Sequence, residues 1–456
     1  MKNYRSTLAE YGYALPFFPC MGNHDNDGAT PSDENTDFEA SAPFRSIMAP
    51  NYYSYNLGKV HFVVLDDIFY INSGSPSGTA NVGSRNYKGY IPDYELDWLK
   101  EDLKDLDKNT PLIIGMHIPV WQRHTSVLDS CYANLNYNGR NSSVDLAEIV
   151  KDFKTVHLIS GHTHWNHHAH PADYPNIHEN NIAAICASWW YTGTKTGWHN
   201  CRDGCPGGYE MFHINGTDIS YKYHSIEHNG NAQFHVLDVN TLKKYYQDNM
   251  DAFLKQYTAF TDFRTWADDQ LLINVFSFDN DWKVEAVENG EQLAPQRMYM
   301  EDPYHMLTYD IPYYNTGTEL GTDARSTKNN HMFTVQCKTA ASPVTIRVTD
   351  TFGTTYEQNI MRPVAFTLSA IDTATTMVAG IRNIPYSTHE KAQITAGNGC
   401  IKISIAHAAT ACICKLNGHV QHIKLQAGNN EIPVKRGNIY IVAIGQQNQK
   451  LYISNH

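Results

Sequence analysis

The first 200 residues alternate between short apolar runs and amphipathic stretches, which is the pattern of an α/β domain. Residues 93–106 repeat Leu at helical spacing after Asp93, a suitable N-cap, and residues 144–153 are also amphipathic, so both segments predict helices. Two apolar stretches that meet at a Gly-Lys turn predict a hairpin within residues 52–66. Further strands are predicted at 15–21, 111–116, 155–160 and 182–188.

The pattern changes after about residue 205. Helical periodicity persists near 241–257 and 262–272, whereas the remaining segments alternate apolar and polar positions between turn residues, as in β-rich domains. Residues 372–391 predict a link, and the short strands that follow it indicate a small β-sandwich. The expected order is therefore an α/β domain, a β-rich accessory domain and a terminal β-sandwich, at residues 1–205, 206–370 and 371–456.

Composition and charge narrow the functional classes. The chain has 456 residues, of which 42% are hydrophobic and 18% charged, as expected of a folded protein. Its net charge is −12 without a Lys/Arg cluster, so a nucleic acid polymer is not an expected partner. The sequence predicts neither a transmembrane segment nor a signal peptide at its start. The nine cysteines lack zinc-finger spacing, and Cys201 and Cys205 predict either a local disulfide or free thiols.

Histidine-containing polar blocks follow three of the predicted strands. The blocks are Gly22-Asn23-His24-Asp25, Met116-His117 and Gly161-His162-Thr163-His164. Loops at the ends of neighbouring strands meet at one edge of a sheet, so we expect these side chains to converge. Neutral imidazoles and an Asn oxygen suit first-row metals, which predicts a centre of one or two ions. A single histidine after a strand is more often a surface or core residue, and only the combination favours a metal site.

Two further groups of residues lie beside these blocks. His167, His168 and His170 extend the histidine-rich run, and we expect them to be solvated or to face substrate. An aromatic cluster consists of Trp189, Trp190, Tyr191 and Trp198. Such a cluster can stack on part of a substrate or pack between domains, and we favour packing.

The three blocks resemble motifs of the calcineurin-like metallophosphoesterase superfamily. The family pattern runs Asp-x-His, Gly-Asp, Gly-Asn-His-Asp/Glu, a strand-borne His and Gly-His-x-His, and the last three occur here in order. The resemblance implies an α/β metallophosphoesterase-type sandwich. Segments between residues 201 and 363 resemble the C-terminal β-domain of a secreted subgroup typical of Bacteroidetes-type bacteria. Residues 371–456 resemble the secretion- or sorting-related tails of such proteins, which implies a secreted, periplasmic or cell-surface location.

The resemblance also implies roles for individual residues. Asn23, His117 and His162 are expected to bind the second of two metal ions, and His164 the first. These ions are divalent or trivalent Mn, Fe or Zn. A hydroxide activated by both ions is expected to attack the phosphorus of a phosphomonoester or phosphodiester in line. The chain is therefore expected to be a hydrolase with a phosphoester substrate.

The catalytic side chains follow from the same resemblance. His24 is expected to face the phosphate as a general acid, and Asp25 to orient His24. Neither the residues nor the resemblance indicates which residues bind the substrate.

The sequence departs from the family pattern in its first two motifs. Neither Asp-x-His before Gly22 nor any Gly-Asp dipeptide occurs. Four of seven expected metal ligands remain, all neutral, and these should not hold a tight dinuclear pair. We therefore expect Met1 not to be the natural start, with an upstream segment completing both the fold and the site. The alternative is a catalytically inactive binding or surface-display protein on a degenerate phosphoesterase scaffold.

Overall fold

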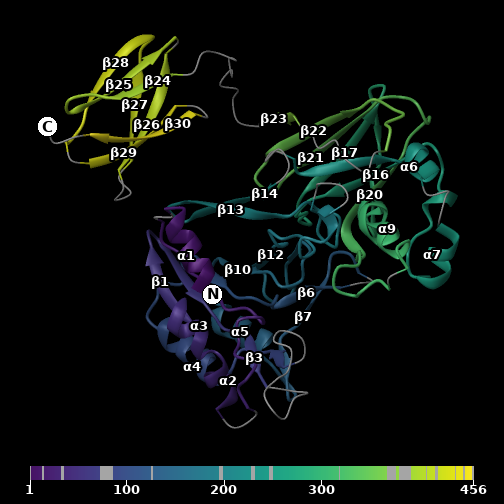
Figure 1. The fold of residues 1–456 in the computed structure, drawn as a ribbon, viewed down its shortest axis with the longest axis horizontal. Helices are drawn as coiled ribbons and strands as arrows, with labels where there is room; N and C mark the ends of the chain where they lie inside the picture. The colour runs from purple at the N-terminus through teal and green to yellow at the C-terminus, as the bar shows by residue number, and fades with distance from the viewer. Residues whose placement is uncertain are drawn as a thin grey trace. The chain divides into compact units, whose positions relative to one another are not determined.

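The computed structural model forms two compact units, Met1–Ile381 and Arg382–His456 (Figure 1). The domain boundaries predicted near residues 205 and 370 stay predictions, and most of the predicted link at 372–391 lies outside the described residues. The structure describes residues 2–12, 15–31, 35–71, 86–124, 127–194, 199–226, 232–245, 250–317, 319–366, 376–378, 392–406, 408–415, 420–436, 438–444 and 447–453.

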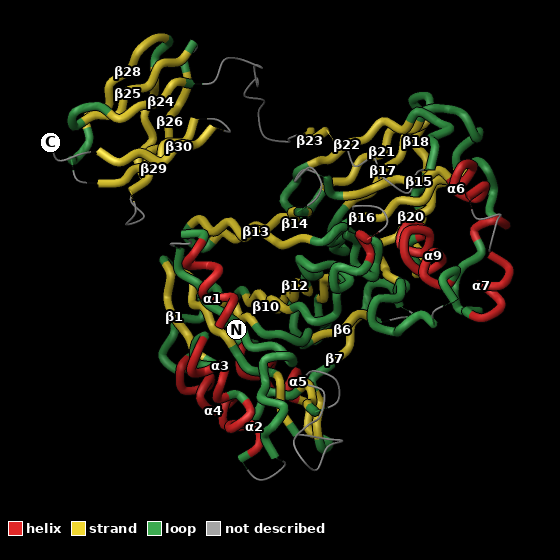
Figure 2. Tube along the Cα trace, in the orientation of Figure 1, coloured by secondary structure: helices red, strands yellow, loops and turns green. Residues whose placement is uncertain are grey.

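A six-stranded mixed sheet lies at the centre of the first 200 residues (Figure 2). Its strands, in spatial order, are β1 (Tyr53–Leu57), β2 (Val60–Val64), β5 (Leu112–Gly115), β10 (Val156–Ser160), β12 (Ile177–Asn181) and β11 (His167–Ala169). The four inner strands are parallel, whereas β1 and β11 are antiparallel to their neighbours. The predicted hairpin and the strands predicted at 111–116 and 155–160 are confirmed.

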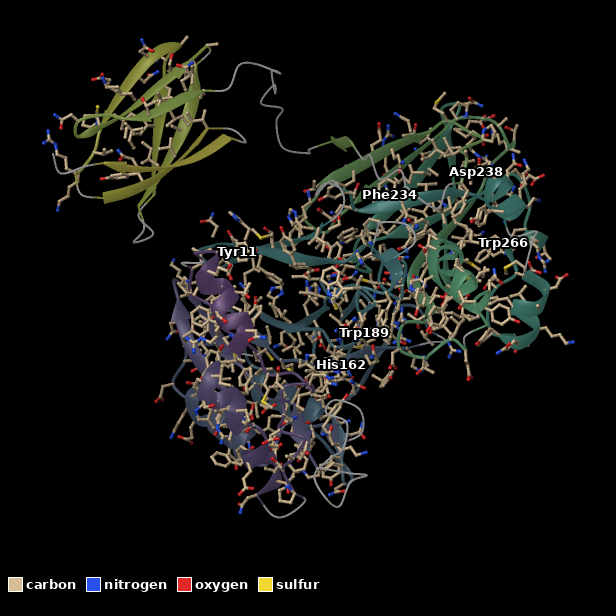
Figure 3. All side chains as sticks on the ribbon, in the orientation of Figure 1. Tyr11, His162, Trp189, Phe234, Asp238 and Trp266 are labelled. Carbon is tan, nitrogen blue, oxygen red and sulfur yellow. The ribbon has the colours of Figure 1, made fainter. Side chains whose placement is uncertain are left out.

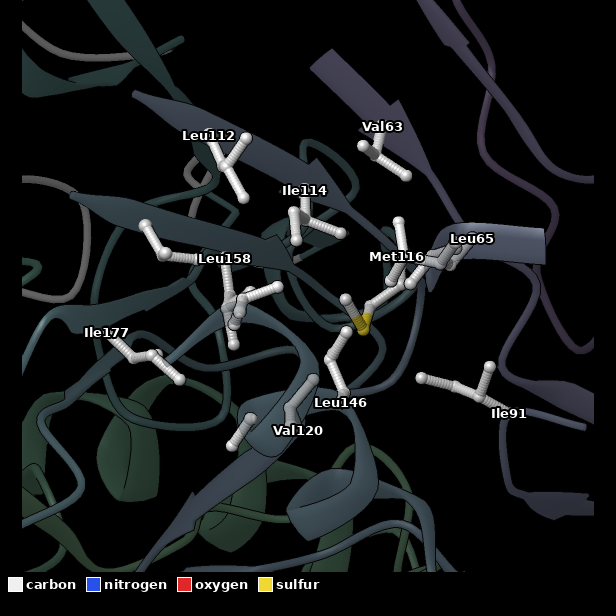
Figure 4. Close-up of a cluster of buried hydrophobic side chains, with 14 of the residues drawn as sticks. Val63, Leu65, Ile91, Leu112, Ile114, Met116, Val120, Leu146, Leu158 and Ile177 are labelled. Carbon is white, nitrogen blue, oxygen red and sulfur yellow. The ribbon is translucent and has the colours of Figure 1, made fainter. Parts of the chain in front are cut away.

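The sheet is held by a continuous apolar core (Figure 4). Ile114 of β5 pairs in register with Leu158 of β10, and both side chains are fully buried. Leu146, on helix α5 (Ser142–Val150), lies in the same cluster. Burial of each such side chain stabilises the fold by about 1.5–3 kcal/mol, so the ends of β5 and β10 are rigid supports for the loops that follow them.

Five described helices belong to this part of the chain: α1 (Lys2–Glu10), α2 (Thr36–Ala40), α3 (Ala42–Ile47), α4 (Asp93–Asp102) and α5. The amphipathic pattern predicted α4 and α5, whereas it gave no prediction for α1, α2 and α3. The N-cap of α4 is Pro92, so the prediction of Asp93 as the cap is wrong by one position. Asp93 is instead the first helical residue, where a carboxylate still stabilises the positive end of the helix.

Three strand or helix predictions are wrong. Residues 15–21 form no strand, and they meet β1 through side chains instead, as where the Tyr53 hydroxyl donates to the Pro19 carbonyl at 3.0 Å. Residues 182–188 form turns after β12 ends at Asn181. Helices α6 (Val239–Tyr245) and α7 (Met250–Gln256) overlap the helix predicted at 241–257, of which residues 246–249 lie outside the described residues. Residues 262–272 contain a short 3-10 turn, η3 (Phe263–Thr265), and then enter β16.

The rest of the first unit is rich in strands. A hairpin joins β13 (Gly208–Asn215) to β14 (Asp218–Ser225). One sheet has the order β15 (Phe234–Asp238), β16 (Gln270–Val275), β20 (Asn329–Gln336), β19 (Gln296–Met300), and another has β18 (Glu291–Leu293), β17 (Lys283–Glu288), β21 (Val344–Thr349), β22 (Thr355–Ile360), β23 (Thr376–Val378). Buried side chains from both sheets share one apolar cluster, among them Ile273 and Ile346.

Shorter elements complete this unit. The two-stranded ladders are β3 (Ile68–Tyr70) with β4 (Tyr87–Gly89), β6 (Trp121–Arg123) with β7 (Cys131–Ala133), and β8 (Asn136–Tyr137) with β9 (Arg140–Asn141). The remaining helical turns are η1 (Thr192–Thr194), α8 (Pro303–His305), the π-helical η4 (Met306–Asp310) and α9 (Ile311–Tyr314).

The second unit contains two antiparallel sheets. Their spatial orders are β24 (Gln393–Ala396), β25 (Cys400–Ile405), β28 (Gly428–Pro433), and β27 (Val420–Leu425), β26 (Ala409–Lys415), β29 (Asn438–Ile444), β30 (Gln447–Ile453). Ile403 of β25 and Val442 of β29 belong to one buried cluster, so side chains from both sheets form the core of this unit.

Candidate functional site

Two of the three histidine-containing blocks are placed by neighbouring parallel strands. His117 follows β5 and His162 follows β10, and the register of these strands places Gly115 opposite Ile159. The Gly161 amide donates a hydrogen bond to the His117 carbonyl at 3.0 Å, which ties the two loops together. The prediction that these blocks meet at one sheet edge is therefore confirmed for His117 and His162.

Three side chains converge at this edge. Asn23 Oδ1 lies 2.8 Å from His117 Nε2, and His162 Nδ1 lies 3.0 Å from the same nitrogen. A ring nitrogen carries either one proton or one lone pair, so His117 Nε2 can form a full hydrogen bond with only one of these two atoms. Ligand atoms around a tetrahedral zinc-type ion are about 3.3 Å apart, so Asn23, His117 and His162 fit a bound metal ion.

The loop at residues 22–25 is a tight turn that brings Asn23 to His117. The Asp25 amide donates to the Gly22 carbonyl at 2.9 Å, and the Gly22 amide donates to Asp25 Oδ2 at 3.0 Å. A Cβ at Gly22 would lie only 3.2 Å from His117 Cε1, so this close approach favours glycine. His24 is exposed and Asp25 half-buried. Orientation of His24 by Asp25 stays a prediction.

Neighbouring residues hold the His164 ring in the tautomer that can bind a metal ion through Nε2. Its Nδ1–H donates to the Ala187 carbonyl, and its ring stacks on Trp189 at 3.8 Å between centroids. Figure 3 labels Trp189 and His162. A backbone hydrogen bond at Nδ1 fixes the tautomer that leaves Nε2 as the free lone pair. His164 lowers the pKa of the nearby His162, but its participation in a metal centre stays a prediction.

Backbone strain is concentrated in the two segments that meet here. His162, His164, Ala187, Trp189 and Trp190 have φ values of 66°, 58°, 50°, 54° and 63°. A left-handed conformation costs a non-glycine residue about 1–3 kcal/mol and is typical of functional sites. This concentration supports a functional role for the Gly-His-x-His loop and the turn that follows β12.

The two most buried histidines of this edge are neutral at physiological pH. Burial, followed by the nearby His162 and His24, lowers the pKa of His117 to about 3. Burial, followed by His164 and His24, lowers the pKa of His162 to about 4. The neutral imidazole is the form that binds a metal ion, so both side chains are ready ligands.

Asp67 is a supporting residue that sequence reasoning missed. Its Oδ1 accepts from the His117 amide at 3.2 Å and its Oδ2 from the Ile118 amide at 2.7 Å. Burial, with a contribution from Asp66, raises the pKa of Asp67 well above its usual value, although the two amides oppose this shift. The signal was the Asp66-Asp67 pair directly after a predicted strand.

Glu179 supports the same loop from the other side. Its carboxylate accepts from the Val120 amide at 2.9 Å, the Trp121 amide at 2.6 Å and the Ser160 hydroxyl at 2.6 Å. Burial raises the pKa of Glu179 to about 7, against the effect of these donors. Glu179 thus connects β12 to both the chain after His117 and the end of β10.

The aromatic cluster is partly open to solvent. Trp190 and Tyr191 are 49% and 57% exposed, and packing between domains stays a prediction for both. They lie beyond a turn that directs their side chains toward solvent, whereas Trp189 packs on His164. Trp198 lies outside the described residues. The exposed pair adjoins the candidate site through Trp189.

The histidines after the Gly-His-x-His block also differ from their prediction. His167 and His168 are 1% and 8% exposed, and His170 is half-buried. His167 and His168 lie in the edge strand β11, where the adjoining strands and the chain after β16 cover them. The expectation that these residues are solvated is therefore wrong for His167 and His168.

Cys201 and Cys205 are buried free thiols. The turn is instead closed by the Cys201 amide, which donates to the Cys205 carbonyl at 2.6 Å. Of the two alternatives left open by the sequence, the structure shows free thiols. Among the described residues, no helix is both long and apolar enough to span a membrane.

Comparison with known families agrees with this geometry. Residues 2–166 match calcineurin-like phosphoesterase, and residues 179–356 match the C terminal of calcineurin-like phosphoesterase. The chain therefore contains a calcineurin-like phosphoesterase domain followed by the C-terminal domain of this family, whose activity is metal-dependent hydrolysis of phosphoester bonds. All three histidine-containing blocks lie within the first match. No curated protein matches the chain.

Proposed function

We propose that the protein is a phosphoester hydrolase with two divalent or trivalent metal ions, Mn, Fe or Zn, that cleaves phosphomonoesters or phosphodiesters. The observation that carries this proposal is the convergence of Asn23 Oδ1 and His162 Nδ1 on His117 Nε2, at 2.8 and 3.0 Å. In this assignment these three residues hold one ion and His164 Nε2 contributes to the other. The C-terminal family match supports the same class of enzyme.

The residues of the chain have separate tasks. When bound, the ions supply positive charge that neutralises phosphoryl oxygens and lowers the pKa of nearby water. Asp67 supports His117 through the backbone amide of His117 itself, and Glu179 supports the chain that follows through the Val120 amide. His24 is exposed beside the proposed metal ligand Asn23. In this assignment its imidazolium donates a proton to the leaving alkoxide, and Asp25 orients the His24 ring.

The substrate leaving group is proposed to lie over the exposed aromatic pair. Trp190 and Tyr191 follow Trp189, which is stacked on His164. Flat apolar rings beside a phosphate site favour an aromatic or apolar ester group over a small hydrophilic one.

We place the protein outside the cytoplasm, in the secreted, periplasmic or cell-surface compartment. Cell fractionation followed by detection with an antibody tests this location.

The competing function is a non-catalytic binding protein on the same scaffold. It is favoured by one observation: the four assigned metal ligands are all neutral, whereas carboxylates normally offset the charge of two adjacent ions. A catalytic centre predicts metal-dependent turnover, and a binding protein predicts a phosphoester complex without turnover.

Hydrolysis of bis(p-nitrophenyl) phosphate and p-nitrophenyl phosphate by the purified protein tests the proposal. Activity should require Mn²⁺, Fe²⁺ or Zn²⁺, disappear with a chelator and return with added metal. His117→Ala should abolish it, whereas His213→Ala, which removes an exposed histidine from β13, should not. Metal-loaded protein that binds these esters without hydrolysing them would favour the binding protein.

A further inference from the structure

We propose that His168, His178 and Asp279 form a separate metal site for a zinc-type ion, which joins the phosphoesterase sheet to its C-terminal domain. His168 lies on β11 and His178 on β12, at one edge of the six-stranded sheet. Asp279 lies in the chain between β16 and β17. None of these residues belongs to the candidate catalytic centre, and the inference does not rest on the proposed function.

The ligand atoms are spaced as in a tetrahedral site. His168 Nδ1 lies 3.0 Å from His178 Nε2, His178 Nε2 lies 3.3 Å from Asp279 Oδ2, and His168 Nδ1 lies 3.7 Å from Asp279 Oδ2. Metal–ligand bonds of about 2.0–2.1 Å in a tetrahedron separate the ligand atoms by about 3.3 Å. The observed spacings bracket this value, so an ion fits between the three atoms with small side-chain shifts.

A fourth ligand atom completes the arrangement. Tyr221 Oη, from β14, lies 3.1 Å from His178 Nε2 and 3.4 Å from Asp279 Oδ2. His178 Nε2 therefore has three polar partners within 3.3 Å, although one ring nitrogen has only one proton or one lone pair. A cation among these four atoms would be within reach of all of them at once.

Surrounding polar groups hold His168 in the tautomer that a metal requires. His168 Nε2 lies 2.9 Å from Ser277 Oγ, and Ser277 Oγ donates to Glu210 Oε1 at 2.7 Å. The serine oxygen thus accepts the Nε2 proton, which leaves the lone pair of His168 on Nδ1, toward His178 and Asp279. A histidine ligand supported by a carboxylate in this way is characteristic of protein metal sites.

The carboxylate is oriented in the same manner. His170 Nε2 lies 2.7 Å from Asp279 Oδ1, which leaves Oδ2 for the ion. The Asp279 and His168 side chains are 0% and 1% exposed, whereas His170 and His178 keep 35% and 17% of their side-chain surface. An ion can therefore enter past His170 and His178, and two neutral imidazoles with one carboxylate favour Zn²⁺ or Co²⁺ over Mg²⁺ or Ca²⁺.

The test measures metal binding and not activity. The full chain carrying His117→Ala and His162→Ala, which disable the candidate catalytic centre, is titrated with Zn²⁺ and with Co²⁺. We expect one tightly bound ion per chain, the intense visible absorption of tetrahedral Co²⁺, and a rise in melting temperature on Zn²⁺ addition. An additional His178→Gln or Asp279→Asn should weaken binding at least tenfold and remove the absorption and the melting shift.

A matched control is His157→Gln, because His157 is buried beside His178, at 5.6 Å between ring centroids, without lying among the four ligand atoms. This variant should keep the ion. The proposal is overturned if the His117→Ala, His162→Ala chain shows no tetrahedral Co²⁺ absorption, or if His178→Gln and Asp279→Asn leave the bound ion in place. Neither result bears on phosphoester hydrolysis by the unaltered chain, which is measured separately.

Discussion

The Asp67 carboxylate accepts a hydrogen bond from the backbone amide of His117 at 3.2 Å, while His117 Nε2 lies 2.8 Å from Asn23 Oδ1. Asp67 therefore positions a predicted metal ligand through the backbone. Because the carboxylate also accepts the Ile118 amide, it determines the direction in which the chain leaves β5.

Asp67→Asn should weaken metal binding and phosphoester hydrolysis by about 10–100-fold, because the amide side chain can accept only one of the two backbone hydrogen bonds. Isothermal titration with Mn²⁺ and the dependence of the hydrolysis rate on metal concentration measure this effect. Raised metal concentration should recover much of the rate. Asp105→Asn, at an exposed position, is the control, and equal behaviour of the two variants would contradict the positioning role.

Gly22→Ala should lower kcat/KM by about tenfold or more with little change in melting temperature. The added Cβ would lie 3.2 Å from His117 Cε1, so the His117 ring must shift by a few tenths of an ångström. Gly321→Ala is the matched control, since a Cβ at that position would meet nothing within 4 Å and its backbone is not left-handed. Unchanged kinetics in Gly22→Ala would show that the close approach has no functional role.

Glu179 should make stability depend on pH. Its folded-state pKa of about 7 lies above the usual 4.5, so the folded state binds the extra proton between these values. The stabilisation that this proton gives to the folded state is complete below about pH 4.5. It is lost as the pH rises to about 7, which lowers the free energy of unfolding by about 3 kcal/mol in total.

Urea unfolding of the unaltered chain and of Glu179→Gln, at intervals from pH 4.5 to 8, measures this contribution. The difference in unfolding free energy between the two proteins should shift in favour of Glu179→Gln as the pH rises. A difference that is independent of pH would show that Glu179 keeps an ordinary pKa in the folded state.

Trp190→Ala should raise KM for bis(p-nitrophenyl) phosphate about three- to tenfold, because it removes a stacking surface of about 0.5–1.5 kcal/mol. The kcat should change little, since the ring does not contact the reacting atoms in the proposed assignment. Tyr132→Ala, which removes an exposed ring from β7, is the control. Unaltered KM for the aryl diester would remove the support for an aromatic leaving-group platform.

Much of the α/β sheet could be predicted because its inner strands are continuous apolar runs. Residues 111–116 and 155–160 are buried on both faces, so their sequence alone indicates strands, and the blocks after them could be placed at a shared edge. Residues 15–21 are equally apolar, yet a strand also requires a hydrogen-bonded neighbour. Apolar residues at 182–188 likewise indicated a strand, but Ala187 takes a left-handed conformation in a turn there.

The buried histidine cluster could not be predicted for a different reason. His170 and Asp279 are 109 positions apart and meet only through the packing of β11 and β12 against the chain after β16. The sequence showed that His168 and His170 were unusual, but nothing local indicated which carboxylate would cover them. Asp67 and Glu179 were missed because their carboxylates accept from backbone amides, and the sequence does not indicate which amides a carboxylate will meet, even where an Asp-Asp pair follows a strand.

The proposed function depends above all on Asn23, His117 and His162 holding a catalytic metal ion together. Crystals soaked in Mn²⁺ and measured at an energy where manganese scatters anomalously test this assignment most directly. We expect an anomalous peak within about 2.0–2.3 Å of Asn23 Oδ1, His117 Nε2 and His162 Nδ1. The absence of an anomalous peak at this position at saturating Mn²⁺ would contradict the assignment.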